Sequence, residues 1–509
     1  MKKLPIGIQT FEKIRKENYI YIDKTKEAYE LIDNYTYAFL SRPRRFGKSL
    51  FLDTLKNIFE GKKEFFEGLY IYDKWNWEDK YPVITINWAG EFDSDDKLRD
   101  RAYEILLKSQ KELKVECNES KTIGGCLEEL IQKTYRKYDK RVVILIDEYD
   151  KPILDVIENP TQAKKNREFL KALYSIIKAN DEYIKFAFLV GVSKFSKASI
   201  FSGLNMFSDI SLNPNYGNIC GYTQNDIETT FKPYLEGVDL TRFKKFYNGY
   251  NFLADDIYNP FDVLKFIINQ KIFRNYWYES GNPSFLIKLM DKNKYFLPEL
   301  SNLIVDEKLL DSFDIESIDF EVILYQSGYL TIEEMIQDED GISYKLKIPN
   351  IEVKQALFDD IARYLTKEHN TLKLRKSIRA ALKTADLESL KNILFSIYAS
   401  IPYNDLTNIK EYEGYYASVA FAYIQALGIQ IIGEDVTNKG RIDLTCFIED
   451  KIYIIEFKTQ KNGKRPLEQI KENKYYEKYQ NQNKDIYLVG IKFDTEDRNI
   501  KEFEWEKLI

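Results

Sequence analysis

The stretch RPRRFGKSLFL, residues 42–52, decides the fold of the N-terminal half of the chain. Gly47-Lys48-Ser49 completes the second half of the signature G-x-x-x-x-G-K-[ST], in which backbone N–H groups and the lysine surround phosphates and the hydroxyl reaches Mg²⁺. Arg42 stands where the first glycine is expected, so the match is partial. Because Gly-Lys-Ser is common by chance, its surroundings must decide between a phosphate site and an ordinary turn.

The residues on either side predict a strand, a loop and a helix in that order. YTYAFLSRP (35–43) is a short apolar run that ends at a proline, and apolar residues with helical spacing follow at Leu50, Leu52, Leu55 and Ile58. This order directs the N–H groups of the loop and the positive end of the helix dipole at one point, where an anion binds. The context favours a nucleotide site over a chance turn.

A second motif supports that interpretation. RVVILIDEYDKP (141–152) begins as a continuous apolar strand, typical of a sheet buried on both faces, and ends in Asp147 and Glu148. In a site that binds ATP, Asp147 and Ser49 would organise Mg²⁺, and Glu148 would polarise the water that attacks the γ-phosphate. The alternative is a strand followed by a solvated acidic turn.

Two further strands, at 81–90 and 183–196, alternate with helical stretches and predict a parallel α/β sheet with helices on both faces. At the end of the later strand, Ser193 and Lys194 are either sensors of the γ-phosphate or an ordinary strand end. Arg44 and Arg45 flank the loop, and we expect at least one to point toward phosphate or a neighbouring subunit; the alternative is a basic surface turn.

The C-terminal part carries a second constellation, in GRIDLTCFIEDKIYIIEFKT (440–459), which predicts a hairpin. Glu456 and Lys458 lie two residues apart on one strand, so they share a face, and Asp443 on the neighbouring strand can face them. Two carboxylates can hold Mg²⁺, and the lysine can orient or deprotonate the attacking water at a phosphodiester. The alternative is charged decoration of an exposed strand.

Composition limits the chemistry. The net charge is −6 and the pI about 5.5, so contacts with nucleic acid must be local; the candidate patches are 373–383, which also reads as a solvated helix face, and 461–465. The single histidine, His369, argues against Ser-His-Asp hydrolysis, histidine-ligated metal and histidine phosphotransfer. Catalysis must therefore use carboxylates, lysines and metal.

The cysteines and the apolar runs indicate in which cellular compartment the protein is expected. The cysteines are scattered without a C-x-x-C pair, which indicates neither a disulfide framework nor a zinc site: Cys117, Cys126, Cys220 and Cys446. The N-terminus is charged, and no run approaches the roughly 18 apolar residues of a membrane span. We expect a cytoplasmic protein without membrane contact.

Several stretches together resemble one family. They are LPIGIQTFEKIRKENYIYIDKT, RPRRFGKS, VVILIDEYDKP, GVSKFSKASIFSGLNMFSDIS and YNGYNF. They are similar to the prokaryotic AAA-ATPase-like family, in which such a module is fused to a PD-(D/E)XK nuclease-like domain. The resemblance covers nearly the whole chain, and the family also carries RPRRFGKS without the leading glycine.

The resemblance implies further site residues. Glu413, in the setting EGYY, matches an acidic residue on a helix of the family and is an additional candidate metal ligand. Ala417 stands where the family often has histidine, which puts any role of that imidazole in doubt. Gln469 matches a glutamine of the family that could contact phosphate or water; a surface glutamine without a role is the alternative.

The predicted architecture is a P-loop domain at 1–235, a helical and mixed lid or connector at 236–370, and a restriction-endonuclease-like α/β domain at 371–509 with its core at 409–497. The predicted function is an ATP-binding and ATP-hydrolysing protein that controls a Mg²⁺-dependent nuclease acting on nucleic acid, with DNA favoured and a homo-oligomer left open. The alternatives are a nucleotide-dependent switch whose nuclease-like domain only binds nucleic acid or protein, and a signalling ATPase that acts on a protein partner.

Overall fold

The computed structural model describes residues 1–195, 206–278, 284–293, 295–310, 319–367, 370–401, 413–459 and 465–508. The chain forms two compact units, an N-terminal unit of residues 1–277 and 305–344 and a C-terminal unit of residues 278–304 and 345–509. The predicted boundaries at 235 and 370 differ from this division. The reason is connectivity, since the chain passes between the units at 277, 304 and 344.

The N-terminal unit is built on a parallel sheet with the strand order β2-β3-β4-β1-β5. Its strands are β1 Tyr37–Ser41, β2 Val83–Asn87, β3 Val142–Asp147, β4 Ile184–Gly191 and β5 Ser208–Asp209. Every residue of β3 is buried, as its uninterrupted apolar sequence predicts. The predicted strands are confirmed, and β5 is an addition that the sequence pattern did not indicate.

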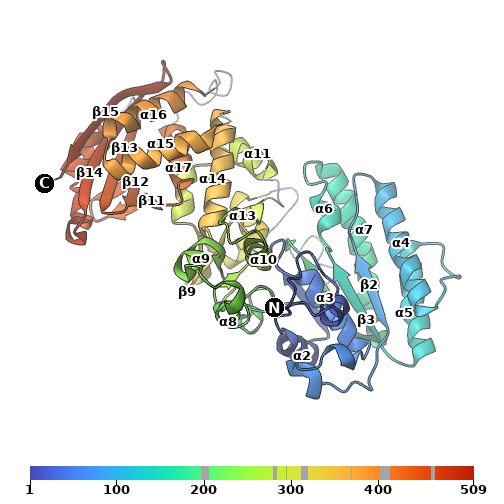
Figure 1. Ribbon diagram of the computed structural model, residues 1–509. Helices are drawn as coiled ribbons and strands as arrows, with labels where there is room; N and C mark the ends of the chain where they lie inside the picture. Colours follow the sequence, from blue (N-terminus) through green and yellow to red (C-terminus); the bar gives the residue numbers. More distant parts are fainter. Residues whose placement is uncertain are drawn as a thin grey trace. The chain divides into compact units, whose positions relative to one another are not determined.

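Helices cover both faces of this sheet (Figure 1), which confirms the predicted α/β class. One group is α1 Phe11–Lys16, α2 Thr25–Asn34 and α3 Lys48–Phe59; the other is α4 Asp95–Leu113, α5 Ile123–Tyr138, α6 Lys151–Leu154 and α7 Pro160–Ala179. Side chains cap the longer helices: Ser94, Thr122 and Asn159 each accept a backbone N–H in the first turn of α4, α5 and α7. Local sequence therefore sets where these helices begin.

Smaller elements complete the N-terminal unit. They are α8 Gln224–Glu228, α9 Leu240–Tyr247, β6 Asn248–Tyr250, β7 Ile257–Tyr258, α10 Pro260–Ile268, α12 Glu307–Leu310, α13 Phe320–Ser327, β9 Thr331–Asp338 and β10 Gly341–Lys347. β6 and β7 form a two-stranded sheet, and β10 pairs between β9 and β8 Ile304–Asp306.

The C-terminal unit is built on a mixed sheet with the order β11-β12-β13-β14-β15. The strands are β11 Gln430–Thr437, β12 Gly440–Ile448, β13 Lys451–Thr459, β14 Asp485–Asp494 and β15 Asn499–Lys507. β12 and β13 form the predicted antiparallel hairpin, and β13 pairs with β14 in parallel. Its helices are α11 Ser284–Lys292, α14 Ile351–Thr366, α15 Thr371–Thr384, α16 Leu387–Ala399, α17 Glu413–Gln425 and α18 Pro466–Glu472, with a 3₁₀ turn at Leu297–Ser301.

The basic stretch at 373–383 forms most of α15, and two of its arginines have structural partners. Arg375 donates to the carbonyl of Ala426 and pairs with Asp359 at 3.1 Å, and Arg379 donates to the carbonyl of Leu427. These carbonyls follow the last turn of α17, where cations are favoured by the helix dipole. These two side chains hold α15 to the end of α17, a packing role that neither the nucleic-acid patch nor the solvated helix face predicted.

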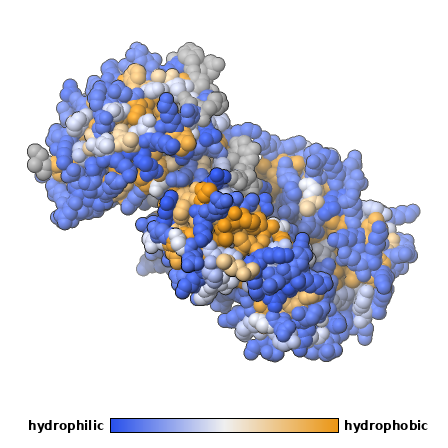
Figure 2. Space-filling view, viewed as in Figure 1, coloured by the Kyte–Doolittle hydropathy of each residue, from blue (hydrophilic) through white to orange (hydrophobic). Residues whose placement is uncertain are grey.

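Apolar side chains are buried on the sheets and polar ones cover the surface. Figure 2 shows a face on which hydrophilic residues predominate and hydrophobic ones gather in smaller patches. In the part of the chain that the structure describes, the helices are all too short or too polar to cross a bilayer. His369, the side chain of Glu413 and most of the patch at 461–465 lie outside the described residues.

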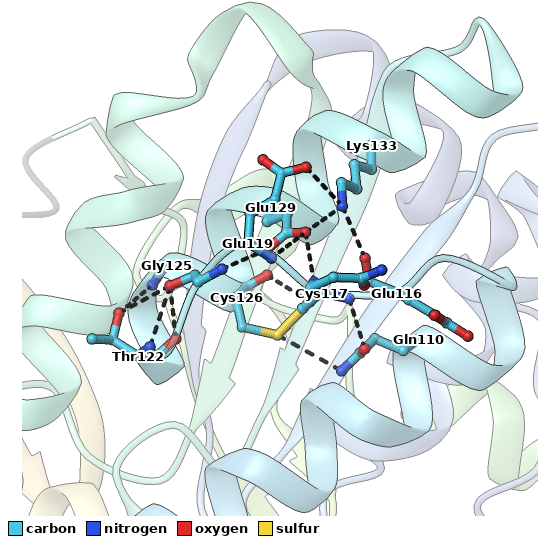
Figure 3. Close-up of a disulfide and its surroundings, with 11 residues drawn as sticks. Gln110, Glu116, Cys117, Glu119, Thr122, Gly125, Cys126, Glu129 and Lys133 are labelled. Carbon is cyan, nitrogen blue, oxygen red and sulfur yellow. Dashed lines mark hydrogen bonds and ion pairs between the residues drawn. A yellow bond between two sulfur atoms is a disulfide. The ribbon is translucent and has the colours of Figure 1, made fainter.

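A disulfide joins Cys117 to Cys126, which the cysteine spacing did not indicate (Figure 3). The bond links the segment before α5 to the first turns of that helix. Glu129 reinforces the link, because its carboxylate accepts the N–H of Asn118 at 2.8 Å and of Ser120 at 3.2 Å and pairs with Lys133. Pairing depends on how the chain folds back along α5, which spacing alone cannot reveal. Cys220 and Cys446 are buried and are not in disulfides.

We predict that Cys117→Ser lowers the free energy of unfolding by about 2–3 kcal/mol, because opening a short loop restores entropy to the unfolded chain. Urea unfolding with and without a thiol reductant measures this. Reductant should destabilise the wild type by a similar amount and leave Cys117→Ser unchanged. A wild type that is insensitive to reductant would contradict the pairing.

Candidate nucleotide and nuclease sites

The loop between β1 and α3 has the geometry of a phosphate loop. Gly47 precedes the helix with φ +92°, a left-handed conformation that favours glycine, and a Cβ built there would meet no atom within 4 Å. The buried Lys48 folds back over the loop and donates to the carbonyls of Arg42 at 2.8 Å and Pro43 at 2.9 Å. Burial lowers the pKa of Lys48, and the charges of Asp147 and Asp150 oppose that effect. Phosphate oxygens could take the place of the two carbonyls.

Arg42, at the position of the missing glycine, is 1% exposed, so its side chain is buried within the protein. Its guanidinium donates to the carbonyls of Ser41 and Ser211, both at 2.8 Å, and of Tyr216 at 3.1 Å. It also lies over the ring of Phe252, 3.9 Å from the centroid. Burial lowers the pKa of Arg42 to about 10, so it remains charged at neutral pH. The arginine thus anchors the loop in place of a flexible glycine.

The acidic residues after β3 lie beside the loop. Burial raises the pKa of Asp147, and the nearby Ser49 and Lys48 act in the opposite direction. Asn87, at the end of the adjacent strand, donates to Asp147 at 3.4 Å; sequence reasoning missed this residue, which strand pairing places opposite Asp147. Glu148 follows with φ +53°, and burial together with Asp147 raises its pKa. Lys48, Ser49, Asp147 and Glu148 are therefore brought together.

Two residues connect this acidic turn to the predicted sensor residues. The buried carboxylate of Asp150 accepts the N–H of Val192 at 2.9 Å and of Ser193 at 2.6 Å. The hydroxyl of Tyr149 donates to the carbonyl of Ser193 at 2.8 Å. Lys194, the next residue, forms an ion pair with Asp209 of β5. The ends of β3 and β4 are thereby joined, and the loop joins them too, since the N–H of Arg42 donates to the carbonyl of Gly191 at 3.1 Å.

Arg44 and Arg45 are both exposed. The carbonyl of Arg44 accepts from Asn259 at 3.3 Å, and the guanidinium of Arg45 lies 4.9 Å from the centroid of the Phe261 ring. Arg45 has φ +70°, which a non-glycine residue adopts only where its surroundings hold it. Both contacts tie the loop to the start of α10.

The nuclease motif forms a cluster on the hairpin of β12 and β13. β12 and β13 pair as far as Leu444 and Ile455, and Asp443 and Glu456 are the adjoining residues of the two strands. The two carboxyl groups lie near each other, since the charge of Asp443 helps to raise the pKa of Glu456. Asp443 Oδ2 accepts the N–H of Phe457 at 2.7 Å. Lys458 Nζ lies 3.2 Å from Glu456 Oε1. Gln469 of α18 donates to the same oxygen, which gives this glutamine a partner in the cluster.

Glu456 carries the electrostatic strain of the cluster. Its residue is 1% exposed, and its Oε2 has no hydrogen-bond partner within the described residues. Burial first, and the neighbouring Asp443 second, raise the pKa of Glu456 to about 8, while Lys458 acts in the opposite direction. A cation that bound Oε2 would relieve both effects.

The chemistry of these donors fits Mg²⁺, which takes carboxylate oxygens and keeps several waters. The described residues contain no group of three or more His, Cys, Asp or Glu side chains arranged to hold a metal ion. Asp443 and Glu456 are the two carboxylates that would hold the ion, with waters and substrate oxygens to complete the shell. Glu413 was predicted to be an additional metal ligand, and its side chain lies outside the described residues.

Glu434 is a further acidic residue near this cluster that sequence reasoning missed. It lies on β11 across from Asp443, at a point where the pairing of β11 with β12 is interrupted, and it has φ +52°. Its buried carboxylate forms an ion pair with Arg441. Burial raises the pKa of Glu434, and Arg441 and Lys458 act in the opposite direction. The sequence signal that could have identified Glu434 is an acidic residue that follows directly on the apolar run in IIGEDV.

These features define a phosphate-loop nucleotide-binding module joined to a restriction-endonuclease-like domain. The family model "Predicted AAA-ATPase" matches residues 5–201, and the model "PD-(D/E)XK nuclease superfamily" matches residues 411–503. The chain is 40% identical over 514 residues to an uncharacterized protein encoded in the vnfD 5' region of Azotobacter chroococcum mcd 1, covering 100% of this chain and 99% of that protein. The chain belongs to the family of AAA-ATPase-like proteins that carry a C-terminal PD-(D/E)XK nuclease superfamily domain.

A search of solved structures finds the ORC2 protein of Aeropyrum pernix, described as its ADPNP-ADP complexes. The similarity has a TM-score of 0.27 and 12% sequence identity, and it covers 69% of this chain and 98% of that chain. A similarity of this size does not bear on the function of this chain.

We predict that Arg42→Gly, which restores the consensus glycine, destabilises the protein and does not tighten ATP binding. The change leaves the carbonyls of Ser211 and Tyr216 without their charged donor, at a cost of about 3 kcal/mol. Urea unfolding and calorimetric titration with ATP measure the two effects. Arg44→Gly is the control for the unfolding measurement, because the Arg44 side chain is exposed. Tighter ATP binding by a fully stable Arg42→Gly would contradict the anchoring role.

Proposed function

We propose that the protein binds and hydrolyses ATP in its N-terminal unit and thereby controls a Mg²⁺-dependent nuclease in its C-terminal unit. The observation that carries the proposal is the cluster of Asp443, Glu456 and Lys458, with a buried carboxylate oxygen that has no hydrogen-bond partner among the described residues. A domain that only bound nucleic acid would not need this arrangement, since such a carboxylate disfavours both folding and the approach of phosphate.

At the nucleotide site, Lys48 exchanges its two loop carbonyls for the β- and γ-phosphates of ATP. Gly47 and the first turn of α3 present N–H groups to the same phosphates. Ser49 and Asp147 are the residues that would hold Mg²⁺, and the ion would neutralise charge on the phosphates. Glu148 accepts a proton from the attacking water, and its raised pKa makes it a stronger base. Ser193 reports the γ-phosphate through its ties to Asp150 and Tyr149, and Lys194 reports it through its ion pair with Asp209.

At the nuclease site, Asp443 and Glu456 are the residues that would hold Mg²⁺, and the ion would supply activation of water and stabilisation of charge on the phosphate. Lys458 orients or deprotonates that water from its place beside Glu456. Gln469 holds the Glu456 carboxylate in position. The reaction is hydrolysis of a phosphodiester bond: water adds to phosphorus and a sugar oxygen leaves with a proton.

The remaining parts of the proposal concern partners. The substrate is nucleic acid, with DNA favoured, and the setting is the cytoplasm, where both ATP and DNA are available in a prokaryotic cell. Binding must be local, because the chain carries a net charge of −6. Arg44 and Arg45 are the exposed cations that would meet phosphate or a second copy in a homo-oligomer.

We predict that Asp443→Ala and Glu456→Ala abolish cleavage while the protein stays folded, because each removes a ligand of the cation. Lys458→Ala should keep metal binding and slow cleavage by about 10²- to 10⁴-fold. The measurement is single-turnover cleavage of labelled single-stranded, duplex and branched DNA and RNA in Mg²⁺ and in EDTA. Asp450→Ala is the control, an exposed acid in the turn of the same hairpin. Binding without cleavage by the wild type would instead favour the interaction switch.

We predict that Lys48→Ala abolishes ATP binding, and that Glu148→Gln binds ATP without turning it over. Calorimetric titration and release of inorganic phosphate measure the two steps. Lys56→Ala, on the same helix but paired with Glu60, should behave as the wild type. Equal ATP affinity in Lys48→Ala would remove the assignment of the loop, and undiminished turnover in Glu148→Gln would move the base elsewhere.

A further inference from the structure

A segment more than a hundred residues beyond the phosphate loop packs against it. This reading segment, as we call residues 320–330, comprises α13 and the turn that follows. It belongs to the N-terminal unit although the chain has already entered the C-terminal unit and returned. Sequence reasoning assigned it only a connecting role.

Gln326 is the first contact of the reading segment with the nucleotide site. Its side chain is buried, and its Nε2 donates to the carbonyl of Lys194 at 3.2 Å and to that of Leu310 at 3.4 Å. The Oε1 atom is buried and has no hydrogen-bond partner within the described residues. The Gln326 amide therefore holds the backbone at the end of β4. Its Oε1 atom can accept a new hydrogen bond when the end of β4 moves.

Gly328 is the second contact. It ends α13 with φ +90°, and a Cβ built there would lie 2.7 Å from Cβ of Pro43 in the phosphate loop and 3.4 Å from the ring of Trp277. Any side chain at this position would therefore push the loop or the tryptophan. The glycine is required by close approach as well as by its backbone conformation.

The reading segment also touches the points where the chain leaves the N-terminal unit. Trp277, packed on Gly328 and 5.1 Å from the ring of Tyr329, is the last residue before the chain enters the C-terminal unit. In the other direction the segment continues through β9 into β10, and within β10 the chain enters the C-terminal unit again at residue 345. The reading segment thus contacts the phosphate loop, the end of β4 and Trp277, where the chain leaves the N-terminal unit.

We propose that Gln326 and Gly328 are positioning residues of the nucleotide site, through which the state of bound ATP is transmitted to the nuclease unit. This inference rests on the proposed function. When phosphates bind, Lys48 leaves the carbonyls of Arg42 and Pro43, and the loop and the end of β4 adjust. Pro43 and Lys194 are the residues that the reading segment contacts. The shift is passed to Trp277 and to β9, which lead directly into the C-terminal unit.

The chain provides a matched pair of variants for the test. Gly328→Ala introduces a Cβ at φ +90° against Pro43, whereas Gly341→Ala introduces one at φ +123°, in the turn between β9 and β10, with nothing within 4 Å. Both changes strain the backbone, so only the contact with the loop separates them. Gln326→Glu keeps the shape of the side chain and removes its donors.

The experiment measures, for the full-length protein in Mg²⁺, ATP affinity by calorimetry and cleavage of a labelled nucleic acid with and without ATP. We expect Gly328→Ala to weaken ATP binding about tenfold or more, to cleave without ATP at the wild-type rate, and to lose the response of cleavage to ATP. Gln326→Glu should bind ATP and lose most of the same response. Gly341→Ala should match the wild type in all of these.

The outcomes separate this inference from the proposed function. If Gly328→Ala and Gly341→Ala behave alike, the inference is overturned while the proposed function stands. If the wild type binds ATP but cleaves nothing, the nuclease proposal fails, and with it the transmission step, while weaker ATP binding by Gly328→Ala alone still supports the positioning role. If the wild type does not bind ATP, both are overturned.

Discussion

A buried guanidinium, that of Arg42, is the constraint on which the nucleotide site depends. Its guanidinium donates to the carbonyls of Ser211 and Tyr216, which are 169 and 174 residues away in sequence. The loop therefore cannot adopt its form until those segments are in place. In the usual motif a glycine gives the loop freedom at this point; here the freedom is replaced by an anchor. The carbonyl of the same residue also holds Lys48. The position of the lysine, and so of Ser49 beside Asp147, follows from that anchor.

The four residues Asp147 to Asp150 extend this constraint across the sheet. The first two face the loop, and the last two tie the turn to the end of β4. Gly191 makes the tie possible, because a Cβ there would lie 2.6 Å from both Asp150 and the ring of Tyr149. The loop, the acidic turn and the sensor strand therefore form one packed group, and a change in any of them is felt by the others. Packed interiors transmit such displacements because they are not freely deformable.

The sequence predicted the parts of the structure that depend on local pattern. Uniform apolar runs identified β1 to β4, Gly47-Lys48-Ser49 identified the start of α3, and period-two spacing placed Glu456 and Lys458 on one face. What it could not predict depends on contacts between distant segments. The partners of Arg42, the seat of Gly328 on Pro43 and the disulfide between Cys117 and Cys126 arise only when the chain folds back. Glu434 escaped notice because its place across from Asp443 depends on strand pairing, and the role of Arg375 and Arg379 emerged only once α17 was seen to end beside α15.

The electrostatics of Glu456 give a reason for a cation that is independent of any resemblance. A buried carboxylate with an unpaired oxygen is unfavourable by about 1–3 kcal/mol or more, and a second carboxylate opposite adds to the penalty. Lys458 offsets part of it, but it reaches only Oε1, the oxygen that Gln469 already contacts. Apolar residues at these positions would give a more stable sheet. Groups that oppose folding in this way are characteristic of functional sites. Here the missing group is a positive charge next to Glu456 Oε2. The hairpin of β12 and β13 thus presents an oxygen that a small, hard cation would satisfy, which supports the proposed Mg²⁺ site.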